Sequence, residues 1–129
     1  MSLKELGRLE TVVMKAVWRL GRATVRQVRD ALAGDRSFAY TTILTTLRNL
    51  ERKGYLRHDA EGRTHVFLPV VGEKEVARTA LETVLESLFD GSKARLVDTL
   101  FDESDLTERE MESLRRRILE LRREEESDD

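Results

Sequence analysis

The stretch Tyr40-Thr-Thr-Ile-Leu-Thr-Thr-Leu-Arg-Asn-Leu-Glu-Arg-Lys-Gly54 decides the fold, because it predicts a helix with two distinct faces. At about 100° per residue, three aliphatic side chains fall within one narrow arc, with Leu44 at its edge; they are Ile43, Leu47 and Leu50. The opposite face has no carboxylate and consists of Thr41, Thr45, Arg48 and Arg52, flanked by Thr42 and Asn49. Hydroxyl, amide and guanidinium groups suit phosphate oxygens and base edges. Gly54 is placed to end the helix.

A plain solvated surface is the alternative interpretation of this outer face. Threonine is a mediocre helix former, because its branched β-carbon loses rotamer freedom in a helix. Several threonines on a water-facing surface therefore favour a binding role, but only the rest of the chain can decide between the two interpretations.

Two helices are predicted before this stretch. Apolar residues at helical spacing run from Leu6 to Leu20, and Gly21 follows them. Thr24-Val-Arg-Gln27 matches a capping box and predicts a short second helix. The turn 33–36 follows, and Ser37 is expected to start the third helix. This order is that of a helix-turn-helix, whose second helix enters the major groove of DNA.

A β-hairpin is predicted after Gly54. The β-prone segments Tyr55–His58 and Thr64–Leu68 flank a turn with glycine at residues 59–63. A hairpin directly after a helix-turn-helix is a wing, and Arg63 and His65 at its tip would reach backbone phosphate or the minor groove. The predicted fold is therefore mostly α with a small β-hairpin, a winged helix-turn-helix at 1–71 followed by a helical dimerisation region at 72–129.

The second half predicts helices with narrow apolar stripes. Residues 73–89 form one, Ser92 caps a second, and Thr107 with Glu110 forms a capping box for a third, whose apolar residues repeat 3-4-3. These stripes are too thin for an independent core, which predicts a homodimer; packing against the winged part is the alternative. The expected dimer contacts are Leu81, Leu85, Leu88, Leu96, Leu100, Met111, Leu114, Ile118 and Leu121. Residues 124–129 are expected to form a disordered acidic tail.

Composition separates the two halves by charge. Residues 1–70 hold 13 Lys/Arg against 7 Asp/Glu, a balance of +6, whereas residues 71–129 hold 10 against 18, a balance of −8. The basic front is the candidate for polyanion binding. The chain has no cysteine, which excludes disulfides and thiolate metal sites. Neither a signal peptide nor a membrane-spanning run is evident, so a cytoplasmic location without membrane insertion is expected.

No enzymatic motif is present. The sequence lacks a P-loop, a dinucleotide-binding glycine motif and a nucleophile elbow, so neither catalytic residues nor a cofactor are expected. The only histidines are His58 and His65. The predicted hairpin places them roughly opposite each other rather than converging, so no metal site is expected. His65 is either a wing contact or an exposed strand residue.

Four segments together resemble the penicillinase-repressor family of bacterial winged-helix regulators. They are Leu9-Glu-Thr-Val-Val-Met-Lys-Ala-Val-Trp18, Thr24-Val-Arg-Gln-Val28, Ala39-Tyr-Thr-Thr-Ile43 and Leu47-Arg-Asn-Leu-Glu-Arg-Lys-Gly54. The likeness covers roughly residues 5 to 121, and it is specific as a set rather than in any single segment.

The resemblance implies a homodimer that binds a palindromic double-stranded DNA operator and represses transcription. It implies major-groove contacts from Thr41, Thr42, Thr45, Thr46, Arg48 and Arg52; Thr46 enters only through this likeness. In antibiotic-responsive members, a membrane sensor protease system leads to cleavage of an Asn-Phe bond in the dimerisation region. This chain has no Asn-Phe, and the aligned region is Thr99, Leu100 and Phe101. The alternative function is a protein-interaction adaptor that uses a winged helix without DNA; a ligand-sensing winged helix ranks lower, because the dimer seam lacks convergent polar groups.

Overall fold

The computed structural model describes residues 4–34, 37–103 and 106–127. Within them the helices are α1 (Arg8–Leu20), α2 (Val25–Ala31), α3 (Tyr40–Arg52), α4 (Glu73–Phe89), α5 (Lys93–Glu103) and α6 (Glu108–Ser127), and the strands are β1 (Leu56–Glu61) and β2 (Thr64–Pro69). The expected fold class, mostly helical with a small hairpin, is confirmed. The chain divides into two compact units, Met1–Glu82 and Thr83–Asp129, each described by itself below.

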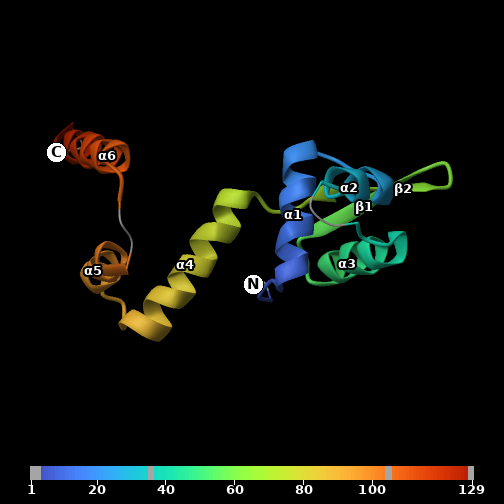
Figure 1. Cartoon of the computed structure of the whole chain (residues 1–129), viewed down its shortest axis with the longest axis horizontal. Coiled ribbons are helices and arrows are strands. Elements are labelled where there is room, and N and C mark those ends of the chain that lie inside the picture. The colour runs from blue at the N-terminus through green and yellow to red at the C-terminus, as the bar shows by residue number, and fades with distance from the viewer. Residues whose placement is uncertain (1–3, 35–36, 104–105, 128–129) are drawn as a thin grey trace. The chain divides into compact units, whose positions relative to one another are not determined.

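The core of the N-terminal unit joins α1, α2, α3 and the hairpin (Figure 1). Its fully buried side chains include those on the predicted inner face of α3 and the aromatic ring of β2; they are Val13, Met14, Val17, Val28, Ile43, Leu47, Leu50 and Phe67. Burying a side chain of this size stabilises the fold by about 1.5–3 kcal/mol. This shared core fixes the orientation of α3 relative to the hairpin.

The ends of the first two helices follow local capping chemistry. α1 begins after Gly7, whose N–H donates to Glu10 Oε1 at 2.8 Å, and it ends at Gly21 with φ +84°. The capping box of α2 is confirmed: Thr24 N–H donates to Gln27 Oε1 at 2.9 Å, and Gln27 N–H donates to Thr24 Oγ1 at 3.2 Å. Ala31, the last residue of α2, is exposed.

The start of α3 differs from the prediction. Its N-cap is Ala39, which supplies no side-chain hydrogen bond, and Ser37 lies outside the helix. The first turn is held by backbone bonds, including Ile43 N–H to Ala39 O at 3.2 Å. At the other end the prediction is confirmed, since Gly54 has φ +93° directly after the helix.

The hairpin turn is shorter than predicted, and this changes its register. Glu61 pairs with Thr64, so the turn contains Gly62 and Arg63 rather than residues 59–63. Gly62 has φ +65° while Arg63 does not have positive φ, a pattern that fits a type II′ turn with glycine first. The sequence prediction placed His58 roughly opposite His65, whereas the structure pairs His58 with Phe67 and His65 with Ala60.

A short bridge ties the hairpin to the link between α1 and α2. Ala23 N–H donates to Phe67 O at 2.9 Å, and Phe67 N–H donates to Ala23 O at 2.7 Å. Arg22 also forms an ion pair with Glu61 near the tip of the hairpin. Trp18 is half-buried and donates from Nε1 to Val71 O at 2.9 Å. The wing is therefore attached at both its base and its outer end.

The helices of the C-terminal unit carry the predicted caps. Arg95 N–H donates to Ser92 Oγ at 3.2 Å, and Glu110 N–H donates to Thr107 Oγ1 at 3.1 Å. The break after α4 is at Asp90 (φ +50°) and Gly91 (φ +77°), as predicted. The tail expectation was wrong for residues 124–127, which continue α6; residues 128–129 lie outside the described part.

The division between the units falls within α4, after Glu82. The first turns of α4 group with the N-terminal unit because Val76 packs against its core. The sequence instead predicts a winged-helix domain at residues 1–71 and a helical domain at residues 72–129. This domain boundary stays a prediction.

Candidate nucleic-acid interface

The core holds α3 so that its polar face points outward. Ile43, Leu47 and Leu50 are fully buried on one side of the helix. On the other side, the exposed residues are Thr41, Thr42, Thr45, Arg48 and Arg52, with Asn49 half-buried beside them. Arg52 donates from Nη1 to Asn49 Oδ1 at 3.2 Å, which orders both side chains along the helix. The outer face is thus a row of donors without a carboxylate.

Thr46 departs from the expectation. Its side chain is only 6% exposed, and its Oγ1 donates to Thr42 O at 2.8 Å. A hydroxyl that donates to the carbonyl four residues earlier uses its hydrogen-bond donor within its own helix. Thr46 therefore belongs to the buried face, and we leave it out of the DNA-contacting residues.

The C-terminal end of α3 is anchored to α1 by an ion pair. Lys53 Nζ lies 2.7 Å from Glu10 Oε1 and also donates to Glu5 O at 3.0 Å. Burial by itself raises the pKa of Glu10, but the hydrogen bonds from Lys53 and from Gly7 N–H outweigh it, so the pKa lies below the usual value of 4.5. The same carboxylate thus caps α1 and holds the end of α3.

Glu51 and His58 connect α3 to the wing. His58 Nδ1 lies 2.7 and 2.8 Å from the two carboxylate oxygens of Glu51. Because a carboxylate only accepts hydrogen bonds, Nδ1 carries the proton. Glu51, the only carboxylate in residues 40–54, is thereby turned toward the wing and away from the outer face of α3.

The two histidines converge, which corrects the sequence expectation. The rings of His58 and His65 are stacked, with centroids 4.4 Å apart and planes at 17°. The two-residue turn places them diagonally on one face of the hairpin, where cross-strand neighbours meet. A register shifted by an odd number of residues would put them on opposite faces.

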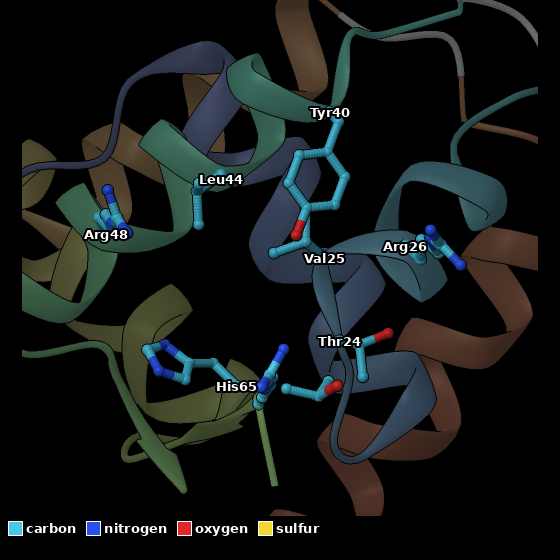
Figure 2. Close-up of a pocket in the computed structure, with 9 residues that line it drawn as sticks. Thr24, Val25, Arg26, Tyr40, Leu44, Arg48 and His65 are labelled. Carbon is cyan, nitrogen blue, oxygen red and sulfur yellow. The ribbon is translucent and has the colours of Figure 1, made fainter. Parts of the chain in front are cut away.

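A basic hollow of about 590 Å³ lies beside the outer face of α3. Figure 2 shows Arg48 and Arg26 on opposite sides of it, with Tyr40 and His65 between them. The full lining comes from α2, α3 and the wing and consists of Thr24, Val25, Arg26, Tyr40, Leu44, Arg48, Arg63, Thr64 and His65. The structure thus brings together Arg48, Arg63 and His65, which the sequence had assigned to two separate elements.

Sequence reasoning missed four polar residues of this hollow. Arg26 lies on α2 and Thr24 is the N-cap of that helix, whereas Tyr40 and Thr64 lie at the starts of α3 and β2. The sequence could have indicated Arg26. Val25 and Val28 define the buried side of α2, and Arg26 lies on its exposed side. The convergence itself depends on tertiary packing.

Two further observations concern chemistry other than DNA binding. Within the described ranges, no group of three or more His, Asp or Glu side chains is arranged to hold a metal ion. No helix of that same part of the chain is long and apolar enough to cross a membrane.

Comparisons with known proteins agree with this geometry. Transcriptional regulator BlaI of Mycobacterium tuberculosis is 34% identical over 121 residues, covering 93% of this chain and 87% of that protein. The penicillinase repressor of Bacillus licheniformis is 25% identical over 113 residues, 88% of each chain. The solution structure of the DNA-binding domain of the repressor BlaI matches with a TM-score of 0.51 and 30% identity, covering 57% of this chain and 90% of that domain.

The sequence profile of the penicillinase repressor family matches nearly the whole chain, over residues 6–120. Together with the identity to the mycobacterial regulator over most of both chains, this match shows that the protein belongs to the penicillinase repressor family.

Proposed function

We propose that this protein is a homodimeric transcriptional repressor that binds a palindromic DNA operator through α3 and the wing. The observation that carries the proposal is the outer face of α3, which is free of carboxylates and held rigidly by a fully buried inner face. A helix of this kind fits the major groove, where guanidinium and hydroxyl groups contact base edges and phosphates. The names and functions of the similar repressors support the same conclusion.

Each part of the surface has a distinct role in the proposal. Thr41, Thr45 and Arg48 face the groove, and Arg52 with Asn49 extends the contact along the helix. Thr42 flanks them. Arg63 and His65 on the wing contact the DNA backbone or the minor groove. Because the target is DNA, a cytoplasmic site of action in a bacterial cell belongs to the proposal.

Alanine substitutions on α3 test this assignment. Arg48→Ala and Arg52→Ala should each weaken operator binding by about 5- to 150-fold, since a good contact to a base or to a phosphate is worth about 1–3 kcal/mol. Binding is measured by fluorescence anisotropy with the DNA upstream of the protein's own gene. The control is Arg19→Ala, which removes the same charge from an exposed position on α1.

The outcomes distinguish the proposal from its alternative. Unchanged affinity in both α3 variants, with a normal melting temperature, would remove α3 as the recognition helix. If the unmodified protein binds neither its upstream DNA nor any other duplex at low salt, it is instead a protein-interaction adaptor built on a winged helix.

The dimer in this proposal is formed by the helices of the second half. The expected contact residues are exposed in the single chain; for example, the exposed fraction is 52% for Leu81, 57% for Ile118 and 70% for Leu88. Leu85 and Leu96 are half-buried. Apolar surface of this extent on a water-exposed chain favours a protein interface.

Relief of repression by proteolysis completes the proposal. The aligned region of Thr99, Leu100 and Phe101 lies within α5, and Thr99 Oγ1 donates to Arg95 O at 2.9 Å. A protease that acts there, when a membrane sensor protease system triggers it, has to unwind α5 first. In a helix the backbone N–H and C=O groups are hydrogen-bonded to each other, so the peptide bond is not accessible. Mass spectrometry of the chain from cells exposed to a β-lactam tests this step: fragments ending near Thr99 support it, and an intact chain during derepression contradicts it.

A further inference from the structure

The basic hollow contains three arginines that no described carboxylate pairs with. Arg26, Arg48 and Arg63 line it and form no ion pair in the part of the chain that the structure describes. Other arginines of the same unit do pair with carboxylates; they are Arg22 with Glu61, Arg29 with Asp30 and Arg57 with Asp59. Four other arginines of the unit also lack an ion pair among the described residues, namely Arg8, Arg19, Arg52 and Arg78, but none of them lines the hollow. Arg26, Arg48 and Arg63 are set apart by their convergence on one space.

None of the described residues that line the hollow carries a carboxylate. Three like charges around one open space repel one another, and an anion bound among them removes this repulsion. The guanidinium group is planar and donates two parallel hydrogen bonds to phosphate or carboxylate oxygens. The charge distribution therefore points to an anionic occupant.

Hydroxyl groups supply further donors around the same space. Thr24 Oγ1 accepts the capping hydrogen bond from Gln27 N–H, which leaves its own hydroxyl hydrogen available to a ligand. Tyr40 reaches the hollow from the start of α3, with 44% of its surface exposed, and Thr64 reaches it from β2. Donors from three elements surround a volume that exceeds one phosphate group and accommodates its substituents as well.

We propose that the basic hollow is a binding site for a phosphate-bearing anion, with Arg26, Arg48 and Arg63 as its charged ligands. In the operator complex the occupant is a phosphodiester of the DNA backbone, a statement that rests on the proposed function. Arg26 then positions the protein on DNA without reading sequence, since a phosphate contact carries no base information. A free phosphate ester uses the same groups and competes with DNA for them.

The first experiment uses the full-length protein and inorganic phosphate. Backbone amide and arginine Nε signals are followed by two-dimensional NMR during titration with sodium phosphate, against sodium chloride at matched ionic strength. We expect saturable shifts concentrated at Thr24–Arg26, Tyr40 and Thr64–His65, lost in Arg26→Gln. The control is Arg29→Gln, on the same helix but outside the hollow, which should keep the shifts.

The second experiment measures whether DNA uses the site. Arg26→Gln should weaken binding to the operator and to an unrelated duplex by the same factor, on the order of tenfold, as expected for loss of one charge-assisted contact. The plot of log affinity against log salt should become shallower by about 0.9. Arg29→Gln should match the unmodified protein in both respects. Arg26 is exposed, so melting temperatures should not change.

The two experiments separate the anion site, the identity of its occupant and the proposed function. Phosphate shifts that are absent, or that persist in Arg26→Gln, overturn the anion site. Normal DNA affinity in Arg26→Gln, with the phosphate shifts lost, rejects the DNA backbone as the occupant and leaves a free phosphate ester. Phosphate shifts in a protein that binds neither duplex keep the anion site and overturn the proposed function instead.

Discussion

At the scale of single residues, Glu10 and Lys53 show how one contact serves two elements. Glu10 accepts from the backbone at the start of α1 and from Lys53 at the end of α3, and the side chains are only 15% and 25% exposed. A charge-assisted hydrogen bond in such a partly buried place is stronger than an ion pair in open solvent. The pair therefore stabilises the position of α3 and not only the cap of α1.

Acid titration tests this role of Glu10. The folded protein lowers the pKa of Glu10 below its usual 4.5, so the carboxylate contributes stability above pH 4.5 that is lost as the pH falls through the folded pKa. Glu10→Gln should lower the free energy of unfolding by about 1–2 kcal/mol at pH 7, and the difference from the unmodified protein should shrink toward pH 3. Urea denaturation at both pH values measures it.

The control for this prediction is Glu75→Gln, which removes an exposed carboxylate from the first turn of α4. It should leave both the stability and its dependence on pH unchanged. A difference between Glu10→Gln and the unmodified protein that stays constant from pH 7 to pH 3 would contradict an electrostatic role.

At the scale of elements, the wing depends on its two-residue turn. The register set by Gly62 and Arg63 places Arg63 and His65 beside Arg48 and stacks His58 on His65. A longer turn would shift the pairing and turn alternate side chains to the other face. The wing's share of the basic hollow, which is Arg63, Thr64 and His65, thus depends on the backbone conformation of this turn.

Substitution of Gly62 by alanine tests this dependence. Gly62 has φ +65°, a conformation that costs an L-amino acid about 1–2 kcal/mol, although no atom lies within 4 Å of an added Cβ. Gly62→Ala should therefore lower the free energy of unfolding by about that amount and weaken DNA binding through the wing. Thermal unfolding and anisotropy measure the two effects.

Gly34→Ala is the matched control. Gly34 also has free space for a Cβ but does not have positive φ, so the same change should be neutral or slightly stabilising. Equal losses of stability in both variants would mean that the strain at Gly62 is not the cause.

At the scale of the whole molecule, apolar side chains of α4, α5 and α6 are exposed in the part of the chain that the structure describes. On α6 the four expected seam residues are between 42% and 57% exposed, namely Met111, Leu114, Ile118 and Leu121. A second copy of the chain would cover them and place two winged units on one operator, as two-fold symmetric sites require.

Charges introduced into this seam test the dimer. Leu114→Glu combined with Ile118→Glu should produce monomers with weak operator affinity, because burying two unpaired carboxylates in an apolar interface is costly. Analytical ultracentrifugation and anisotropy measure the two effects. The control is Arg116→Glu with Arg123→Glu, which places negative charge on the opposite side of α6 at helical spacing and should leave the dimer intact. A dimer that survives the seam substitutions would move the interface to residues 76–101.

Much of the fold is encoded in local sequence patterns. The 3.6-residue period of the apolar residues fixed which side of α3 is buried, and capping boxes at Thr24 and Thr107 fixed where α2 and α6 begin. These features depend on neighbours within one turn of a helix, so the sequence contains them fully. Thr46 shows the limit, because a hydroxyl that bonds its own helix looks polar in sequence and is buried in the structure.

By itself, then, the sequence determined the family, the order of helices and wing, and the outer face of the recognition helix, since all of these follow from residue spacing. Only the tertiary structure decided the register of the hairpin, the stacking of His58 on His65 and the convergence of Arg26, Arg48 and Arg63. Those features join residues that are 3 to 37 positions apart in the chain. Their proximity depends on a two-residue turn and a shared core, neither of which any single segment specifies.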